Sequence, residues 1–397
     1  MNPPMPLAEG HTPPIDSEEL RALLTLNLLP GLGDVRITSL MRRMGSARRA
    51  LAAVLAGNRD AADAAGSADL QSRVDRMLGW IDERPDIELI GFGAETYPAA
   101  LCALHDPPPL LFARGDVTLL DRTIVSIVGT RASTDYGNDA TRMLAATLAR
   151  ADVVVMSGLA HGIDRVAHEA ALEAGGLTAA VIGSGIDVCY PRRNAGLQDR
   201  IARDGLLLTE FLPGEPALPH HFPRRNRILA ALARIVCVME APARSGALLT
   251  VDHALDLGKV VFALPGPVGR PANAGTNALL RDGAEVLVEP ADVLSALENL
   301  PGTPAERQRA AEQAAGILER RRTRQTAEAQ QAPAAPVPDP PDGPQRRVWT
   351  ATGYDPTHVD ELAATAGVTP ATALAALLEL EVAGYVRQQA GLLFRRS

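Results

Sequence analysis

The chain has 397 residues, a formal net charge of −8, 46% hydrophobic residues and only 3% aromatic residues. This composition supports a sizeable core and two or three domains, and the acidic balance counts against a protein that binds nucleic acid through overall basic charge. Cys102, Cys189 and Cys237 form no C-x-x-C motif, which excludes the common zinc and redox motifs. Because no signal-peptide pattern or bilayer-length apolar run occurs, we expect a cytoplasmic protein without membrane association.

The first 82 residues divide into two parts. Residues 1–15 contain five prolines and are expected to be disordered, whereas 16–82 read as a helical domain that starts at Asp16 and Ser17. Pro30-Gly31-Leu32-Gly33 separates two apolar helical runs. This turn fits the hairpin of a helix-hairpin-helix unit, which can offer backbone N–H groups to a phosphate, or a turn that only packs two helices.

Residues 83–300 alternate between apolar strand patterns and helical patterns. The helices are expected near 137–150, 161–174, 194–204, 225–233 and 246–257, between strands at 122–128, 153–157, 178–183, 206–210, 235–240, 260–264 and 285–288. Continuous apolar strands are typical of a sheet buried on both faces. The alternation predicts an α/β fold with a doubly wound, mostly parallel sheet whose ligand-binding loops follow the strands.

The C-terminal quarter of the chain has a different composition. Residues 301–345 are rich in charge and then in proline, so we expect a linker. Residues 346–397 are expected to form a small domain in which helices at His358–Ala366 and Pro370–Gly384 precede a hairpin at Tyr385–Arg395. This order resembles a winged helix.

The loop after the first parallel strand contains Gly129, Thr130 and Arg131 and is not G-x-G-x-x-G. Its glycine and donor side chains at the start of a helix favour an anion site, with a plain structural turn as the alternative. The next loop contains Ser157, Gly158, His161 and Asp164, followed by His168. The last three residues allow a metal-site hypothesis, although hydrogen bonding at the helix start fits them better.

The most informative segment is 219–227, Pro-His-His-Phe-Pro-Arg-Arg-Asn-Arg. Arginine forks suit phosphate oxygens and an aromatic ring suits an unstacked base, so Phe222 with its neighbouring arginines predicts a groove for single-stranded nucleic acid. Because Lys259 is the only lysine, a genomic bias toward arginine explains the same residues equally well. A further loop places Ser245 and Gly246 at the start of the next helix.

No motif for turnover is present. The chain has no G-x-x-x-x-G-K-[ST] loop and no G-x-S-x-G elbow, which predicts binding without catalysis and without a cofactor.

These loops, in this order, resemble the DNA-processing protein A family (DprA/Smf). The resemblance rests on Ile127–Arg131, Ser157–Asp164, Phe222–Arg227, Ser245–Thr250, and Pro265-Gly266 with Gly275-Thr276-Asn277. It implies an extended Rossmann-like domain flanked by a sterile-alpha-motif-like helical domain and a winged helix. It also implies a homodimer that binds single-stranded DNA, loads the RecA recombinase onto it in natural transformation and helps displace single-strand-binding protein.

Carried over residue by residue, the resemblance implies a DNA-binding pocket. Its members are Gly129, Thr130, Arg131, Ser157, Gly158, Phe222, Asn226, Ser245 and Gly246, to which chemistry adds Arg224 and Arg227. Members often carry a lysine just before the phenylalanine, whereas this chain has His220-His221. Either some positive charge is missing from the site, or protonation of these two histidines tightens binding below about pH 6.5.

Two alternative functions follow from parts of the chain. The first is a nucleotide-phosphoribosyl hydrolase on a related fold, although its P-G-G-x-G-T loop is not reproduced at Pro265-Gly266. The second is a winged-helix transcription regulator.

Overall fold

The computed structural model describes residues 16–300, 304–331, 342–353, 357–383, 385–389 and 392–396. The expectations for 1–15, for most of the proline-rich stretch and for the turn at Ala390-Gly391 lie outside these residues. The chain divides into two compact units at Arg322 and Thr323, each treated separately below.

Five helices form the N-terminal part of the first unit. They are α1 (Ser17–Leu28), α2 (Asp34–Met44), α3 (Ala47–Gly57), α4 (Arg59–Gly66) and α5 (Ala68–Asp82). As the sequence predicts, α1 begins after Asp16, whose carboxylate accepts a hydrogen bond from the Glu18 N–H at 3.2 Å. A hairpin with Gly31 at φ +76° separates α1 from α2.

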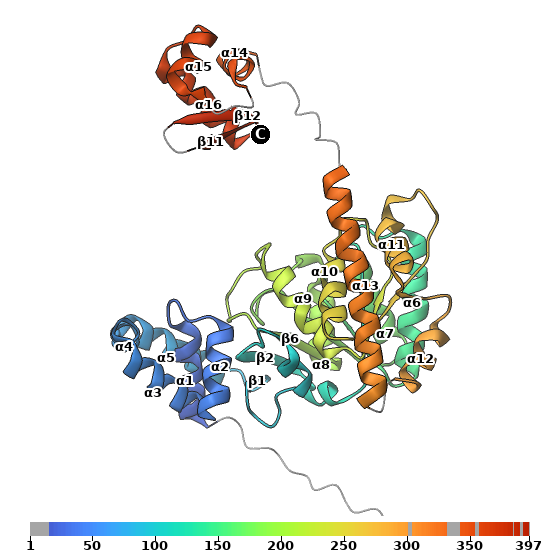
Figure 1. Cartoon of the computed structure of the whole chain (residues 1–397). Coiled ribbons are helices and arrows are strands. Elements are labelled where there is room, and N and C mark those ends of the chain that lie inside the picture. Colours follow the sequence, from blue (N-terminus) through green and yellow to red (C-terminus); the bar gives the residue numbers. More distant parts are fainter. Residues whose placement is uncertain are drawn as a thin grey trace, which may run out of the picture. The chain divides into compact units, whose positions relative to one another are not determined.

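A nine-stranded sheet follows, in the order β1-β2-β6-β5-β4-β3-β7-β8-β9. Its strands β1, β2 and β6 are labelled in Figure 1. The strands from β6 to β9 are parallel, which confirms the predicted fold class. The strand bounds are β1 (Ile87–Gly91), β2 (Leu110–Gly115), β3 (Ile124–Val128), β4 (Val154–Ser157), β5 (Thr178–Val181), β6 (Leu206–Thr209), β7 (Ile235–Val238), β8 (Val260–Ala263) and β9 (Glu285–Val286).

The sequence patterns missed β1 and β2, which pair with each other and extend the sheet antiparallel beyond β6. Only β1 is an edge strand, since β2 lies between β1 and β6, and prolines at 107–109 stand directly before β2. Such a segment carries little periodic signal of its own. Its strand conformation depends on pairing with β6, which is distant in the sequence.

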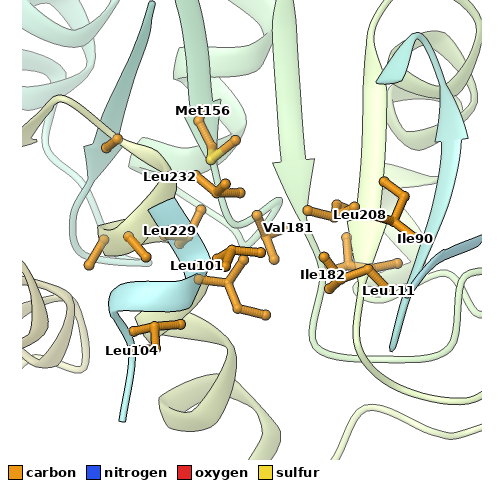
Figure 2. Close-up of a cluster of buried hydrophobic side chains, with 14 of the residues drawn as sticks. Ile90, Leu101, Leu104, Leu111, Met156, Val181, Ile182, Leu208, Leu229 and Leu232 are labelled. Atoms are coloured by element: carbon orange, nitrogen blue, oxygen red, sulfur yellow. The ribbon is translucent and has the colours of Figure 1, made fainter. Parts of the chain in front are cut away.

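Helices cover both faces of the sheet. The helices are α6 (Asp135–Arg150), α7 (Ile163–Glu173), α8 (Ala195–Asp204), α9 (His221–Leu232), α10 (Ala247–Asp256), α11 (Ala274–Asp282) and α12 (Pro290–Glu298). One hydrophobic cluster joins α6, α7 and α12 to one face. Another joins α9, α10 and the short helix η1 (Ala99–Ala103) to the opposite face, where Leu101, Leu229 and Leu232 pack beside Met156 and Val181 (Figure 2).

The region predicted as a linker begins with an ordered helix, α13 (Pro304–Gln331). Ala314, Ile317 and Leu318 are buried in the same cluster as α10, and Arg321 is ion-paired to Asp252 of α10 at 2.5 Å. The high charge of the segment obscured this apolar face. The first part of the expected linker therefore belongs to the packed α/β unit.

The second unit has the predicted winged-helix order with two additions, α14 and β10. Its elements are α14 (Pro344–Ala351), β10 (Thr357–His358), α15 (Val359–Ala366), α16 (Pro370–Val382), β11 (Val386–Gln389) and β12 (Leu393–Arg396). The strands pair in the order β10-β12-β11, and the core includes Val348, Leu362, Leu377 and Phe394.

No single helix among the described residues is long and apolar enough to span a membrane. Residues 359–366 and 370–381 meet the length and composition criteria only as a pair bent by 104°.

The packing of α13 is tested by Ile317→Ala in the full chain. Removing this buried side chain should lower the free energy of unfolding of the α/β unit by about 2–5 kcal/mol, as measured by urea denaturation. Glu319→Ala, on the exposed side of the same helix, is the matched control and should change it by less than about 0.5 kcal/mol. Equal effects would mean that α13 does not pack on the unit.

Candidate nucleic-acid pocket

The candidate site lies where the sheet reverses its winding direction. β3 and β7 are parallel neighbours, with Val125 paired to Ile235, but the chain leaves β3 toward β4 and leaves β7 toward β8. The loops after these two strands therefore diverge and leave a crevice at the carboxyl edge of the sheet, which is the usual ligand site of such folds.

A pocket of about 380 Å³ occupies this crevice. It is lined by the loop after β3, the first turns of α9, and the loop and first turn that begin α10. Most of the predicted DNA-binding residues meet here: Gly129, Thr130, Arg131, Phe222, Asn226, Ser245 and Gly246. The other four, Ser157, Gly158, Arg224 and Arg227, do not line this pocket.

The loop after β3 is held close to its neighbours. The Thr130 N–H donates to the Glu240 carbonyl at 2.7 Å, and the Thr130 carbonyl accepts from the Ile163 N–H at 3.3 Å. A Cβ on Gly129 would lie 2.5 Å from Ile163 Cγ1, so a glycine is required at this close approach. The loop is thus fixed between β7 and α7, and it carries Arg131 to the rim.

The buried carboxylate of Glu240 holds the far end of the same loop. It accepts from the Thr134 N–H at 2.8 Å and from the Thr134 hydroxyl at 2.7 Å, while Thr134 caps α6. Because Glu240 follows β7, these bonds tie together the two loops that bound the crevice.

Arg131 and Phe222, which line the pocket, form a group with the ring of Tyr190, which lies beside Phe222. The Arg131 guanidinium carbon lies 4.7 Å from the centre of the Phe222 ring, and the Phe222 and Tyr190 rings are 5.6 Å apart. Arg131 is exposed and Tyr190 is 45% exposed. The group offers a π-face and a positive charge to solvent. Tyr190 was not predicted as a site residue, although its position in the loop after β5 was a usable signal.

The N-terminus of α10 supplies a second favourable position for an anion. Gly246 occupies its N-cap without a side-chain hydrogen bond, and the first turn carries no acidic residue. Asn226 Nδ2 donates to the Gly246 carbonyl at 3.2 Å and fixes the turn against α9. The Ala247, Leu248 and Leu249 N–H groups already donate to oxygens of Ser245 and Gly246. The positive end of the helix dipole therefore favours negative charge at this end of the pocket.

Arg225 lies beneath the pocket and was not predicted as a site residue. Its side chain is buried, and Nη1 donates to the carbonyl oxygens of Gly158, at 2.8 Å, and Val181. A Cβ on Gly158 would overlap this guanidinium, which explains the glycine and gives it a structural role. Burial lowers the pKa of Arg225 to about 10, against the opposing effect of Asp164, so the side chain stays charged at neutral pH.

The Arg225 Nε atom has no hydrogen-bond partner among the described residues, and Arg225 contributes to the pocket lining. A buried cation with an unsatisfied donor favours an anionic ligand.

His161, Asp164 and His168 do not converge as metal ligands. Asp164 accepts from the Ala160 N–H at 3.3 Å, and burial raises its pKa in spite of the nearby Arg225 cation. Within the described residues, no group of three or more His, Cys, Asp or Glu side chains is arranged to hold a metal ion. The hydrogen bond at the helix start is the role that the sequence favoured for Asp164.

His168 is a buried structural residue. Because the Thr178 hydroxyl donates to the Val155 carbonyl at 2.7 Å, its oxygen must accept from His168 Nδ1 at 2.7 Å. Burial, with a further contribution from the Arg225 cation, lowers the pKa of His168 to about 3. The ring is therefore neutral at physiological pH, with its second nitrogen unprotonated.

Ser157 and Arg227 have structural roles that differ from the prediction. The Ser157 hydroxyl is buried and donates to the Ile127 carbonyl at 2.6 Å, which ties β4 to β3. The Arg227 side chain is 3% exposed and bonds both Glu210 oxygens, at 2.6 and 2.8 Å, and the Asp106 carboxylate, at 3.0 Å. Both side chains are buried and hydrogen-bonded to other residues of the protein.

Arg224 has a mixed environment. Its side chain is 43% exposed, but its guanidinium contacts Asp34 of α2 at 2.6 Å and Glu210 at 3.0 Å. It faces the surface beside α2 and not the crevice between α9 and α10. Of the two histidines before Phe222, His221 is buried against Phe211 and Glu215, and His220 is exposed.

Arg227→Met and Arg131→Gln should separate stability from binding. Breaking the buried Arg227–Glu210 pair should cost about 3–5 kcal/mol of unfolding free energy, because Glu210 loses a buried partner. Arg131→Gln, at the exposed rim, should cost less than about 0.5 kcal/mol. Urea denaturation measures both, and a stable Arg227→Met protein with impaired DNA binding would return Arg227 to the DNA interface.

His168 should make stability depend on pH. Below about pH 6.5 the unfolded chain protonates this ring while the folded chain does not, so the free energy of unfolding should fall by about 1.4 kcal/mol per pH unit as the pH decreases toward 3. His168→Asn keeps a donor for Thr178 but does not titrate. Urea denaturation between pH 7 and 5 should give a shallower slope for the variant, and identical slopes would contradict the assignment.

Comparisons with known proteins show the family to which the chain belongs. Residues 88–298 match the family model for DNA recombination-mediator protein A, and residues 332–391 match the model for the DprA winged helix domain. Protein Smf of Escherichia coli (strain K12) is 36% identical over 79% of this chain and 78% of its own length.

Two solved structures are also similar. DNA processing protein A from Streptococcus pneumoniae is 35% identical, with a TM-score of 0.60 over 70% of this chain and 97% of that chain. The structure describing the single-stranded DNA binding mode of DNA processing protein A from Helicobacter pylori is 32% identical, with a TM-score of 0.50 over 54% of this chain and 96% of that chain. The chain therefore belongs to the DNA recombination-mediator protein A family, DprA/Smf.

Proposed function

We propose that this protein binds single-stranded DNA in the pocket between α9 and α10 and acts there as a recombination mediator. The observation that carries the proposal is the group that Arg131 and Phe222, which line an anion-favouring crevice, form with Tyr190. An exposed ring accepts any base on its face, so the site suits an unpaired strand with little sequence preference.

The floor of the pocket is suited to the phosphate of the same strand. The positive end of the α10 dipole and the buried Arg225 cation both favour an anion, and Arg131 adds charge at the rim. A base on the rings and a phosphate in the crevice are compatible with one nucleotide spanning both features. Duplex DNA keeps its bases stacked inside the helix and cannot use the rings in this way.

The two alternative functions receive less support. For the hydrolase alternative, this chain lacks the required glycine-rich loop. The pocket lining contains a single carboxylate, Asp164, which accepts a hydrogen bond from the Ala160 N–H. The regulator would place α16 in a DNA groove. That helix has no lysine or arginine and carries Glu379 and Glu381, which phosphates would repel.

The full proposal includes partners that follow from family membership. The protein acts as a homodimer in the cytoplasm, loads RecA onto single strands during natural transformation and displaces single-strand-binding protein, without catalysing a reaction. The test follows RecA filament formation on strands precoated with single-strand-binding protein. Acceleration by this protein, lost with Phe222→Ala, supports the proposal, and unchanged filament kinetics would mean that it binds DNA for another purpose.

Stacking and charge can be separated in a binding titration with fluorescent oligonucleotides across salt concentrations. Phe222→Ala should weaken single-strand binding by about 1–3 kcal/mol with nearly the same salt dependence, because it removes a stacked base. Arg131→Gln should flatten the slope of log affinity against log salt by about 0.7, because it removes a phosphate contact.

Thermal unfolding of both variants controls for loss of structure. Equal affinity of the unmodified protein for single-stranded and duplex DNA of one length would contradict the assignment of the pocket.

A further inference from the structure

A second cavity, of about 730 Å³, lies beside the first turn of α9. Its walls come from the hairpin before α2, from one side of α2, from Asp106 and from Arg224. Phe222 and Pro223 line the pocket between α9 and α10, and Arg224 is the next residue. One turn of α9 therefore contributes residues to the lining of both cavities.

Two arginines on α2 leave positive charge at this second cavity. Arg36 and Arg43 are seven residues apart, which places them on one side of the helix about two turns from each other. Both are exposed, and within the described part of the chain neither guanidinium has an ion pair or a hydrogen bond.

The acidic residues of the cavity are already paired. Asp34 contacts Arg224 at 2.6 Å, and Asp106 contacts Arg227 at 3.0 Å. With Glu210, these residues form a cluster of two arginines and three carboxylates. The formal charge of this cluster is −1, and it becomes +1 when Arg36 and Arg43 are included. The unpaired positive charge lies on the side of α2.

We propose that the single strand held between α9 and α10 continues across the first turn of α9 onto α2, where Arg36 and Arg43 bind its phosphates. This inference depends on the proposed single-strand binding and adds a second part to the footprint. The partner is the phosphate backbone of that same strand, because Arg36 and Arg43 offer charge without an aromatic face. The helical region and the α/β sheet then bind one strand together.

The test measures binding of the full-length protein to two single-stranded oligonucleotides, each of one defined sequence. One has about four nucleotides and the other about 20 nucleotides. The double variant Arg36→Gln with Arg43→Gln should weaken binding of the long oligonucleotide and flatten its salt slope by about 1.4, or about 0.7 for each lost contact. It should bind the short one as the unmodified protein does. Arg36→Lys with Arg43→Lys keeps the charge and should preserve the slope.

The matched control is Arg49→Gln, an exposed arginine on α3 that does not line the cavity and should change neither titration. An unchanged affinity of the double glutamine variant for the long strand, or an equal loss for both lengths, would overturn the inference. Phe222→Ala separates the two proposals, because it should weaken both lengths. If the unmodified protein binds neither length, the proposed function fails together with this extension.

Discussion

A buried cation at the carboxyl edge of the sheet constrains the whole site. Arg225 enters between the ends of β4 and β5, where its Nη1 binds the Gly158 and Val181 carbonyl oxygens. Transferring a charge into this interior is costly unless its partners are fixed. The neighbouring loops accommodate this side chain. Gly158 has no side chain where the guanidinium lies. Asp164, in the first turn of α7, carries a negative charge that raises the pKa of Arg225 and so counteracts the effect of burial.

Helical geometry gives the neighbouring arginines different environments. Successive residues of α9 are turned by about 100°, so Arg224 and Arg227 share a side that Arg225 does not. On that side, carboxylates from three elements converge: Glu210 after β6, Asp106 before β2 and Asp34 at the start of α2. Because Glu210 is buried, this cluster is a fixed joint between the N-terminal helices and the sheet.

The fixed joint and the pocket have different requirements. The joint needs arginines with permanent, satisfied partners, whereas the pocket needs an anion-favouring surface that remains open. A single helix supplies both, because its first turn presents Phe222 toward Arg131 and Tyr190 and directs Arg224 and Arg227 toward the acids. This division explains why a run of three arginines does not act as one basic patch.

The sequence by itself determined the repeated, two-sided burial of β3 to β8, since strands covered on both faces must be apolar throughout. It also located the loops after those strands, and with them Gly129, Arg131, Phe222 and Ser245. Tertiary structure decided which arginine reaches solvent, because 3.6-residue periodicity cannot say where Glu210 and Asp106 lie. It also decided the pairing of β1 and β2, the packing of α13 and the position of Tyr190 beside Phe222. Each of these depends on contacts between segments far apart in the chain, which local residue patterns do not encode.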